Sequence, residues 1–230
     1  NGMTASDLNV GIIYIVAVTG LVVTAIIMAG WSAGNKYAIM SAFRSGAQIV
    51  SYEVPMVISI LSVILLVGSF KMGDFVKVQQ EYCWLIFLQP LAFLIYFISA
   101  VAETNRAPFD LPEAESEIVA GYFIEYTGMK FALFFLAEYT NMVTVSAVAT
   151  TLFLGGWTLF GLERIIPPFL IFLVKVLALV FVIIWFRWTF PRLRVDQLMN
   201  FCWKILLPLS LANLVFTGLL SILYTIYYHF

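Results

Sequence analysis

Six long apolar stretches dominate the chain, and short clusters of Gly, Pro, Asn and charged residues separate them. They fall at about residues 9–30, 46–68, 84–103, 129–154, 167–189 and 202–225. About 20 mostly apolar residues are enough for a helix to cross roughly 30 Å of hydrocarbon. The pattern therefore predicts an all-α fold: a polytopic transmembrane helix bundle with six spans, forming a single membrane domain over residues 1–230.

Composition supports this interpretation and excludes several kinds of cofactor site. The chain is 63% hydrophobic and 11% charged, with a mean hydropathy of +1.00, whereas soluble domains are about 25% charged. Its net charge of −1 argues against nucleic acid as a partner. The single histidine excludes a haem held by paired histidines. Cys83 and Cys202 have no Cys-x-x-Cys spacing, so they cannot by themselves hold a zinc ion or an iron–sulfur cluster. We expect no metal, flavin or nicotinamide site in this chain, so that redox cofactors would be bound elsewhere.

The distribution of Lys and Arg predicts an orientation in the bilayer. The first, third and fifth connections between spans, with the span ends next to them, carry eight: Lys36, Arg44, Arg106, Lys130, Arg187, Arg192, Arg194 and Lys204. The opposite side has three: Lys71, Lys77 and Arg164. The positive-inside rule places the first, third and fifth connections on the negative side of the membrane. A bacterial cytoplasmic membrane is the expected location, with the mitochondrial inner membrane and the thylakoid as alternatives.

Four ionisable residues lie where the bilayer would surround them. Glu53, Glu138 and Lys175 are inside spans, and Glu103 ends the third span. Each charge at mid-membrane costs about 2.5–3.5 kcal/mol on insertion scales. A rise of about 1.5 Å per residue puts Glu53 roughly 10 Å, Glu138 roughly 14 Å and Lys175 roughly 18 Å from the negative face. This graded series predicts a proton path, and polar pairing that fixes helix packing is the alternative.

Residues 104–128 form an acidic loop between the third and fourth spans. Asp110 followed by Pro112 and Glu113 predicts a short helix that begins there, and Gly121 is its expected end. Composition alone is compatible with a solvated loop. The proline and phenylalanine residues among the acids favour a stiff loop against which a partner packs. The loop contains one Arg, Arg106, and five acids: Asp110, Glu113, Glu115, Glu117 and Glu125.

This loop and several other segments closely resemble one family. It is the family of the membrane subunit designated H in proton-pumping NADH–quinone oxidoreductase, respiratory complex I, whose mitochondrial counterpart is called subunit 1. The resemblance covers essentially all 230 residues. Its most specific part is AETNRAPFDLPEAESE at 102–117, continued by IEYTGMKFA at 124–132 and EY at 138–139. Supporting matches are AGWS at 29–32, SYEV at 51–54, RLRVDQ at 192–197 and WK at 203–204.

The resemblance implies a site and a set of partners. The partners would be the lipid bilayer and other complex I subunits: the hydrophilic arm with its terminal iron–sulfur cluster and quinone-site subunit, and small membrane subunits next to the antiporter-like arm. Quinone would be the substrate, with FMN and iron–sulfur clusters in partner subunits. Glu53, Glu103 and Glu138 would form a carboxylate channel, with Lys175 as a deeper relay. Phe109 would offer an apolar wall to the isoprenoid chain, and the quinone cavity would be lined or flanked by Arg106, Asp110, Glu113, Glu115, Glu117 and Glu125.

Family members normally have eight spans, and the six found here correspond to the third onward. Two other functions remain open. The first is the homologous membrane subunit of a membrane-bound Ni–Fe hydrogenase, which its co-purifying partners would reveal. The second, of a different class, is an independent ion channel or transporter, which would require ion flux from the isolated chain.

Overall fold

The computed structural model describes residues 8–110, 121–159 and 166–229, and these are helical without any strand. The predicted all-α fold is confirmed. Five helices are long and apolar enough to cross a membrane. They are α1 (Gly11–Ser32), α2 (Lys36–Val67), α7 (Met129–Phe153), α8 (Pro168–Thr189) and a continuous C-terminal helix made of α9 (Val195–Phe201), a π-helical segment (Cys202–Leu206) and α10 (Leu207–His229).

The stretch predicted as the third span is divided into two helices. α4 (Leu85–Leu88) and α5 (Pro90–Glu103) meet at Gln89, whose φ of −132° and ψ of 58° are not helical. Pro90 causes the break, because a proline disfavours the α conformation of the residue before it. The 14 residues of α5 rise about 21 Å, which is shorter than the hydrocarbon core. Gln89 is nevertheless fixed, since its Oε1 accepts a hydrogen bond from Asn213 Nδ2 of α10 at 3.1 Å.

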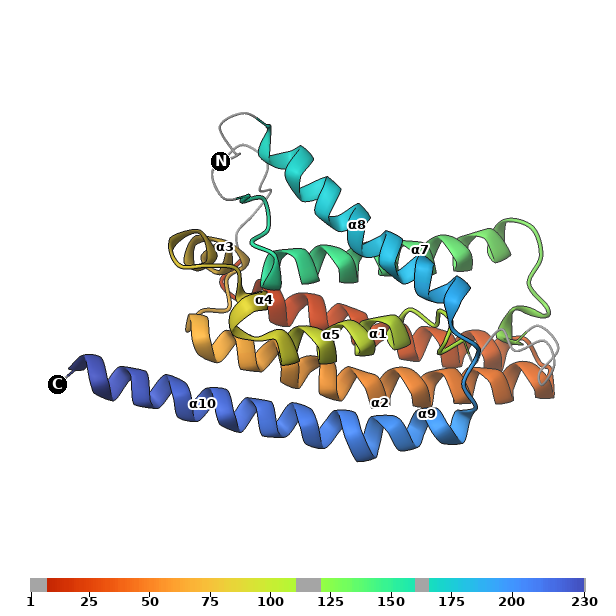
Figure 1. The fold of residues 1–230 in the computed structure, drawn as a ribbon. Coiled ribbons are helices and arrows are strands. Elements are labelled where there is room, and N and C mark those ends of the chain that lie inside the picture. Colours follow the sequence, from red (N-terminus) through yellow and green to blue (C-terminus); the bar gives the residue numbers. More distant parts are fainter. Residues whose placement is uncertain (1–7, 111–120, 160–165, 230) are drawn as a thin grey trace.

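α2 is the central element of the bundle. It packs against α1, α5 and α10, while α7 contacts α5 and α8, and Figure 1 shows α8 crossing obliquely beside α7. α1 and α2 approach closely at Gly30. A Cβ there would overlap Ala42 Cβ and lie 2.9 Å from the carbonyl oxygen of Ala38. Small residues of this kind allow transmembrane helices to pack backbone to backbone.

Three connections meet at one end of the bundle, on the right of Figure 1. We call this the acidic end; it comprises residues 33–35, 104–110, 121–128 and 190–194. Asn35 Nδ2 donates to Glu125 Oε1 at 3.1 Å, and the Leu193 N–H donates to the Pro108 carbonyl at 3.1 Å. The first, third and fifth connections therefore lie together.

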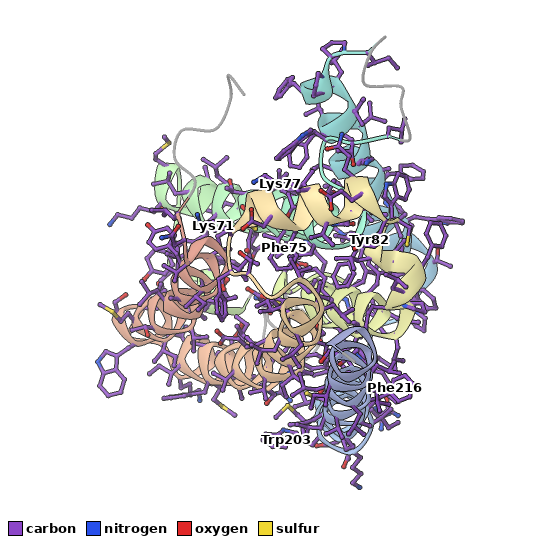
Figure 2. The ribbon with its side chains drawn as sticks, turned by 90° about the vertical axis from the view of Figure 1, so that its left-hand side faces the viewer. Lys71, Phe75, Lys77, Tyr82, Trp203 and Phe216 are labelled. Carbon is purple, nitrogen blue, oxygen red and sulfur yellow. The ribbon has the colours of Figure 1, made fainter. Side chains whose placement is uncertain are left out.

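A short amphipathic helix, α3 (Met72–Glu81), lies across the opposite end, which we call the α3 end. Figure 2 shows Phe75 directed towards the bundle and Lys77 away from it. The Phe75 ring is fully buried, and Gln79 fixes the helix by donating to the Thr151 and Leu152 carbonyls at 3.0 and 3.2 Å. No separate helix was predicted here, because the apolar positions of α3 span fewer than three turns.

α2 contains an interior proline that alters its backbone hydrogen bonding. Pro55 has no N–H, so it cannot donate to the Ser51 carbonyl four residues earlier. The Cys202 thiol donates to this carbonyl instead, at 3.0 Å. Cys202 begins the π-helical segment, a local widening that is frequent at functional sites. The two irregular helix segments therefore contact each other, next to Glu53.

Candidate functional site

Arg106 directs its guanidinium from the end of α5 into the bundle, where it meets α7. One of its terminal nitrogens lies 3.4 Å from Glu138 Oε2, and the two side chains are 5% and 13% exposed. The guanidinium also lies 4.5 Å from the centre of the Tyr139 ring. Tyr122 donates from its hydroxyl to Glu138 Oε1 at 3.4 Å. A cation of the predicted acidic loop is thus paired with one of the predicted membrane carboxylates.

A second contact with α7, made by the last residue of α5, lies one turn away. Asn141 is hydrogen-bonded to Glu103, so residues 103 and 106 of one segment face residues 141 and 138 of α7. Glu103 is 4% exposed and lies close enough to Glu53 for their carboxyl groups to interact electrostatically. Glu53 Oε1 reaches across to α1, where it would be 3.1 Å from a Cβ placed on Gly20.

The three glutamates predicted from the sequence are therefore brought together. From Glu53 through Glu103 and Asn141 to Glu138 and Arg106, ionisable and amide groups follow one another across α2, α5 and α7. Sequence reasoning missed Asn141, although its position one helical turn from Glu138 was a usable signal. It also missed Tyr122, which lies in the acidic loop but carries no charge.

Further buried polar atoms surround this series. Six buried side-chain atoms have no hydrogen-bond partner in the described residues: Ser45 Oγ, Gln48 Oε1, Ser99 Oγ, Glu103 Oε2, Asn105 Oδ1 and Arg106 Nη2. The last of these is the atom that forms the ion pair with Glu138 Oε2. The backbone of Asn105 is left-handed, with φ of 50°. Buried polar atoms are normally bonded to protein or to ordered water, so their concentration beside Glu103 distinguishes this region from an ordinary helix interface.

The start of the acidic loop is anchored to two other parts of the bundle. Gln48 Nε2 of α2 donates to the Ala102 and Phe109 carbonyls, both at 2.8 Å, and Asp110 pairs with Arg192 at 3.3 Å. Phe109 is 6% exposed, and its ring centre lies 5.6 Å from that of Tyr52. The ring therefore packs in the core between α2 and the loop, although the sequence suggested an apolar wall for a bound chain.

The remaining loop acids lie in different places. Glu113, Glu115 and Glu117, and the helix predicted to begin at Asp110, fall in 111–120, outside the described residues. Gly121, the expected helix end, begins a 3₁₀ turn (Gly121–Phe123). Glu125 is exposed beside an open hollow of about 590 Å³, which is lined by Ser32, Ala33, Glu125, Tyr126, Thr127, Met129 and Lys130.

A comparison with known families shows which family the chain belongs to. The sequence profile of the NADH dehydrogenase family matches residues 2–218, which include every described residue of the site. The chain belongs to this family. The resemblance that the acidic loop indicated is confirmed.

Curated relatives carry a more specific description, that of the NADH-quinone oxidoreductase subunit designated H. The relative from Carboxydothermus hydrogenoformans is 52% identical over 218 residues, covering 94% of this chain and 62% of the relative. The protein of the same description from Geobacillus kaustophilus is 52% identical, covering 94% of this chain and 65% of the relative. The one from Dehalococcoides mccartyi strain CBDB1 is 54% identical, covering 95% of this chain and 60% of the relative. The chain thus spans slightly less than two thirds of the length of these family members.

Lys175, the fourth ionisable residue predicted for the proton path of this family member, lies apart from the glutamates. Its ammonium is at the α3 end, where it donates to the Leu154 and Thr158 carbonyls at 2.6 Å and the Gly156 carbonyl at 3.2 Å. These carbonyls follow the C-terminal end of α7, whereas Glu138 is in its N-terminal half. The structure therefore brings together Glu53, Glu103 and Glu138 but does not bring Lys175 to them.

Proposed function

We propose that the chain is a membrane subunit of a proton-pumping NADH–quinone oxidoreductase, with an acidic end that forms part of the quinone-binding tunnel. In this proposal the chain couples quinone reduction to proton translocation through Glu53, Glu103 and Glu138. The family match and the descriptions of the curated relatives support the assignment. The contact that carries the coupling is the buried pair between Arg106, at the start of the acidic loop, and Glu138 of α7.

The partners in this proposal follow from the family to which the chain belongs. FMN and the iron–sulfur clusters would be held by partner subunits, and the terminal cluster would deliver electrons to quinone at the acidic end. We place that end on the negative side of the membrane, as the distribution of Lys and Arg predicts.

Charge is the signal that the site transmits. Reduction of a quinone to a quinol takes up two electrons and two protons, so electron arrival before protonation places negative charge in the tunnel. That charge attracts Arg106 and weakens its hold on Glu138, and it also favours the protonated form of nearby carboxyl groups. Because the carboxyl groups interact, Glu103 and Glu53 take up and release protons as a coupled set rather than singly.

Proton transfer along this series requires a hydrogen-bonded route between the carboxyl groups. The unpartnered atoms of Ser45, Gln48, Ser99 and Glu103 supply polar walls for it. Such a site is polar enough to hold ordered water with several partners per molecule. We propose that water bridges Glu53 and Glu103 to the Arg106–Glu138 pair.

Replacing Glu138 with Gln tests the proposal, since it keeps the shape of the side chain and removes its proton exchange. The variant is assayed in the complete complex in proteoliposomes, as protons pumped per electron transferred. Glu138→Gln should abolish most pumping while the complex still assembles. The matched control is Glu81→Gln, an exposed carboxyl at the end of α3, which should pump normally. Normal pumping by Glu138→Gln would overturn the assignment, and co-purification with a hydrogenase instead of an NADH-oxidising flavoprotein would overturn the choice of complex.

Arg106→Ala tests the loop side of the same site. It removes the guanidinium that joins the start of the acidic loop to α7, and it should raise the apparent Michaelis constant for quinone. An unchanged quinone dependence would separate Arg106 from the tunnel.

A further inference from the structure

The end of α7 contains a loop that is shaped around a positive charge. Carbonyl oxygens of three alternate residues, Leu154, Gly156 and Thr158, converge on the Lys175 ammonium at 2.6, 3.2 and 2.6 Å. We call these three carbonyls the carbonyl cradle. An ammonium has three N–H donors, which matches three acceptors. A neutral amine has two donors and would place its lone pair against the third oxygen.

Two glycines allow the loop to take this form. Gly155 and Gly156 both have left-handed backbones, with φ of 74° and 55°. A Cβ on Gly155 would lie 2.8 Å from Thr158 Oγ1 and 2.9 Å from Trp84 Nε1, and one on Gly156 would lie 2.8 Å from Val76 Cγ2. Close packing and positive φ together require glycine at both positions. The two glycines therefore allow the backbone conformation that directs the three carbonyls towards Lys175.

The surroundings of the cradle favour a cation. It lies at the C-terminal end of α7, where the helix dipole is negative. The Trp84 ring has its centre 4.6 Å from Lys175 Nζ, within the range of a cation–π contact. The loop is also held from outside, because Gln79 Oε1 of α3 accepts from the Gly155 N–H at 2.9 Å. α3, α8, the end of α7 and Trp84, which directly precedes α4, therefore meet around the cradle.

We propose that the loop formed by residues 154–158 is a binding site for a small monovalent cation, that the tethered ammonium of Lys175 fills it, and that this bound charge fixes the end of α7. Lys175 keeps its proton in this role, so it is a structural cation and not a step in a proton path. This differs from the relay role expected from the sequence. The cradle does not depend on the function proposed above, since its contacts lie at the other end of the bundle.

Amide hydrogen exchange of residues 150–158 in the complete complex tests the site. Lys175→Ala should increase exchange there about tenfold or more, because removing charge-assisted hydrogen bonds makes local opening easier. Added methylammonium should restore much of the protection by occupying the cradle. Tetramethylammonium carries the same charge without N–H donors and should restore none. Lys77→Ala, an exposed lysine at the same end with its own ion pair to Asp74, should leave these amides unchanged.

Two outcomes would overturn the cradle: unchanged exchange in Lys175→Ala, or equal protection by both added cations. If Lys175→Ala does not assemble, Lys175→Gln replaces it, since its neutral amide still donates hydrogen bonds. Exchange as slow as in the unmodified protein would then show that charge is not needed.

Lys175→Arg separates the cradle from a proton relay. Arginine keeps the donors and stays charged throughout the working pH range. The cradle predicts slow exchange and an unchanged ratio of protons pumped per electron. A lower ratio together with slow exchange would assign Lys175 to the proton path instead. Amide exchange tests the cradle, and the ratio of protons pumped per electron tests the coupling proposal. Because the two are measured independently, the experiments show which of the two proposals fails.

Discussion

The Arg106–Glu138 pair makes a quantitative prediction about the stability of the complex. With side chains only 5% and 13% exposed, the pair is buried, and removing one partner of a buried pair costs about 3–5 kcal/mol. Arg106→Gln also loses the contact with the Tyr139 ring, worth about 0.5–2 kcal/mol. One kcal/mol shifts the melting temperature of a chain this size by about 2–4 °C, so the combined loss in Arg106→Gln should lower it by about 7–28 °C.

The double variant Arg106→Gln with Glu138→Gln distinguishes the pair from its separate parts. With both groups neutral, no charge is left buried without its ion-pair partner, and the loss should be smaller than for Arg106→Gln alone. The coupling energy should be about 2–3 kcal/mol, read from the melting temperatures of the purified complex carrying each member of the double-mutant cycle. Losses that add as a simple sum would refute the pairing. As a control, the Lys77–Asp74 pair, whose lysine is 71% exposed, should contribute less than about 1 kcal/mol.

Two further predictions concern contacts that shape the bundle. Gly30→Ala should destabilise the complex by about 1–3 kcal/mol, because overpacking against Ala42 separates α1 from α2. Gly46→Ala is the control, since its Cβ would meet only side-chain atoms, of Ile27 at 3.4 Å and of Val23 at 3.7 Å. It should melt like the unmodified protein, and equal losses in the two variants would contradict this. Arg192→Ala should accelerate amide exchange at residues 104–110, because it removes the ion pair with Asp110. The difference from the unmodified protein should become smaller as salt is added, since the half-exposed Arg192 is screened. An exchange rate that depends neither on the substitution nor on salt would exclude a role for the Arg192–Asp110 pair.

The helices were predictable where the length and hydrophobicity of a segment determine whether it forms a membrane-spanning helix. α1, α2, α7, α8 and the C-terminal helix follow from long runs of high mean hydropathy with few charged residues. The prediction for 84–103 was wrong in detail, because a single Gln-Pro step divides an otherwise apolar run and hydropathy averages over it. α3 was missed for the opposite reason: half of its surface is polar, so a search for continuous apolar segments passes over it.

The site was predictable in its members but not in its geometry. Buried charge is costly in a membrane, so Glu53, Glu103 and Glu138 stood out by type alone. Which of them meet depends on how each helix is rotated about its axis, and a span that is apolar all round carries no information on rotation. Lys175 shows the consequence. The sequence predicts a depth for it close to that of Glu138, but its ammonium bonds to carbonyls that follow the C-terminal end of α7, far from Glu138.

The missing backbone donor at Pro55 has a mechanical consequence for Glu53. α2 has 32 residues and is about 48 Å long. It resists bending wherever its backbone hydrogen bonds are complete. The Ser51 carbonyl lacks its backbone hydrogen bond and accepts one from the Cys202 thiol instead. A thiol is a weak donor. Flexing at this point therefore costs less than elsewhere in α2. We therefore expect α2 to bend most readily beside Ser51, two residues from Glu53, so that a bend at this point would change the position of that carboxyl group.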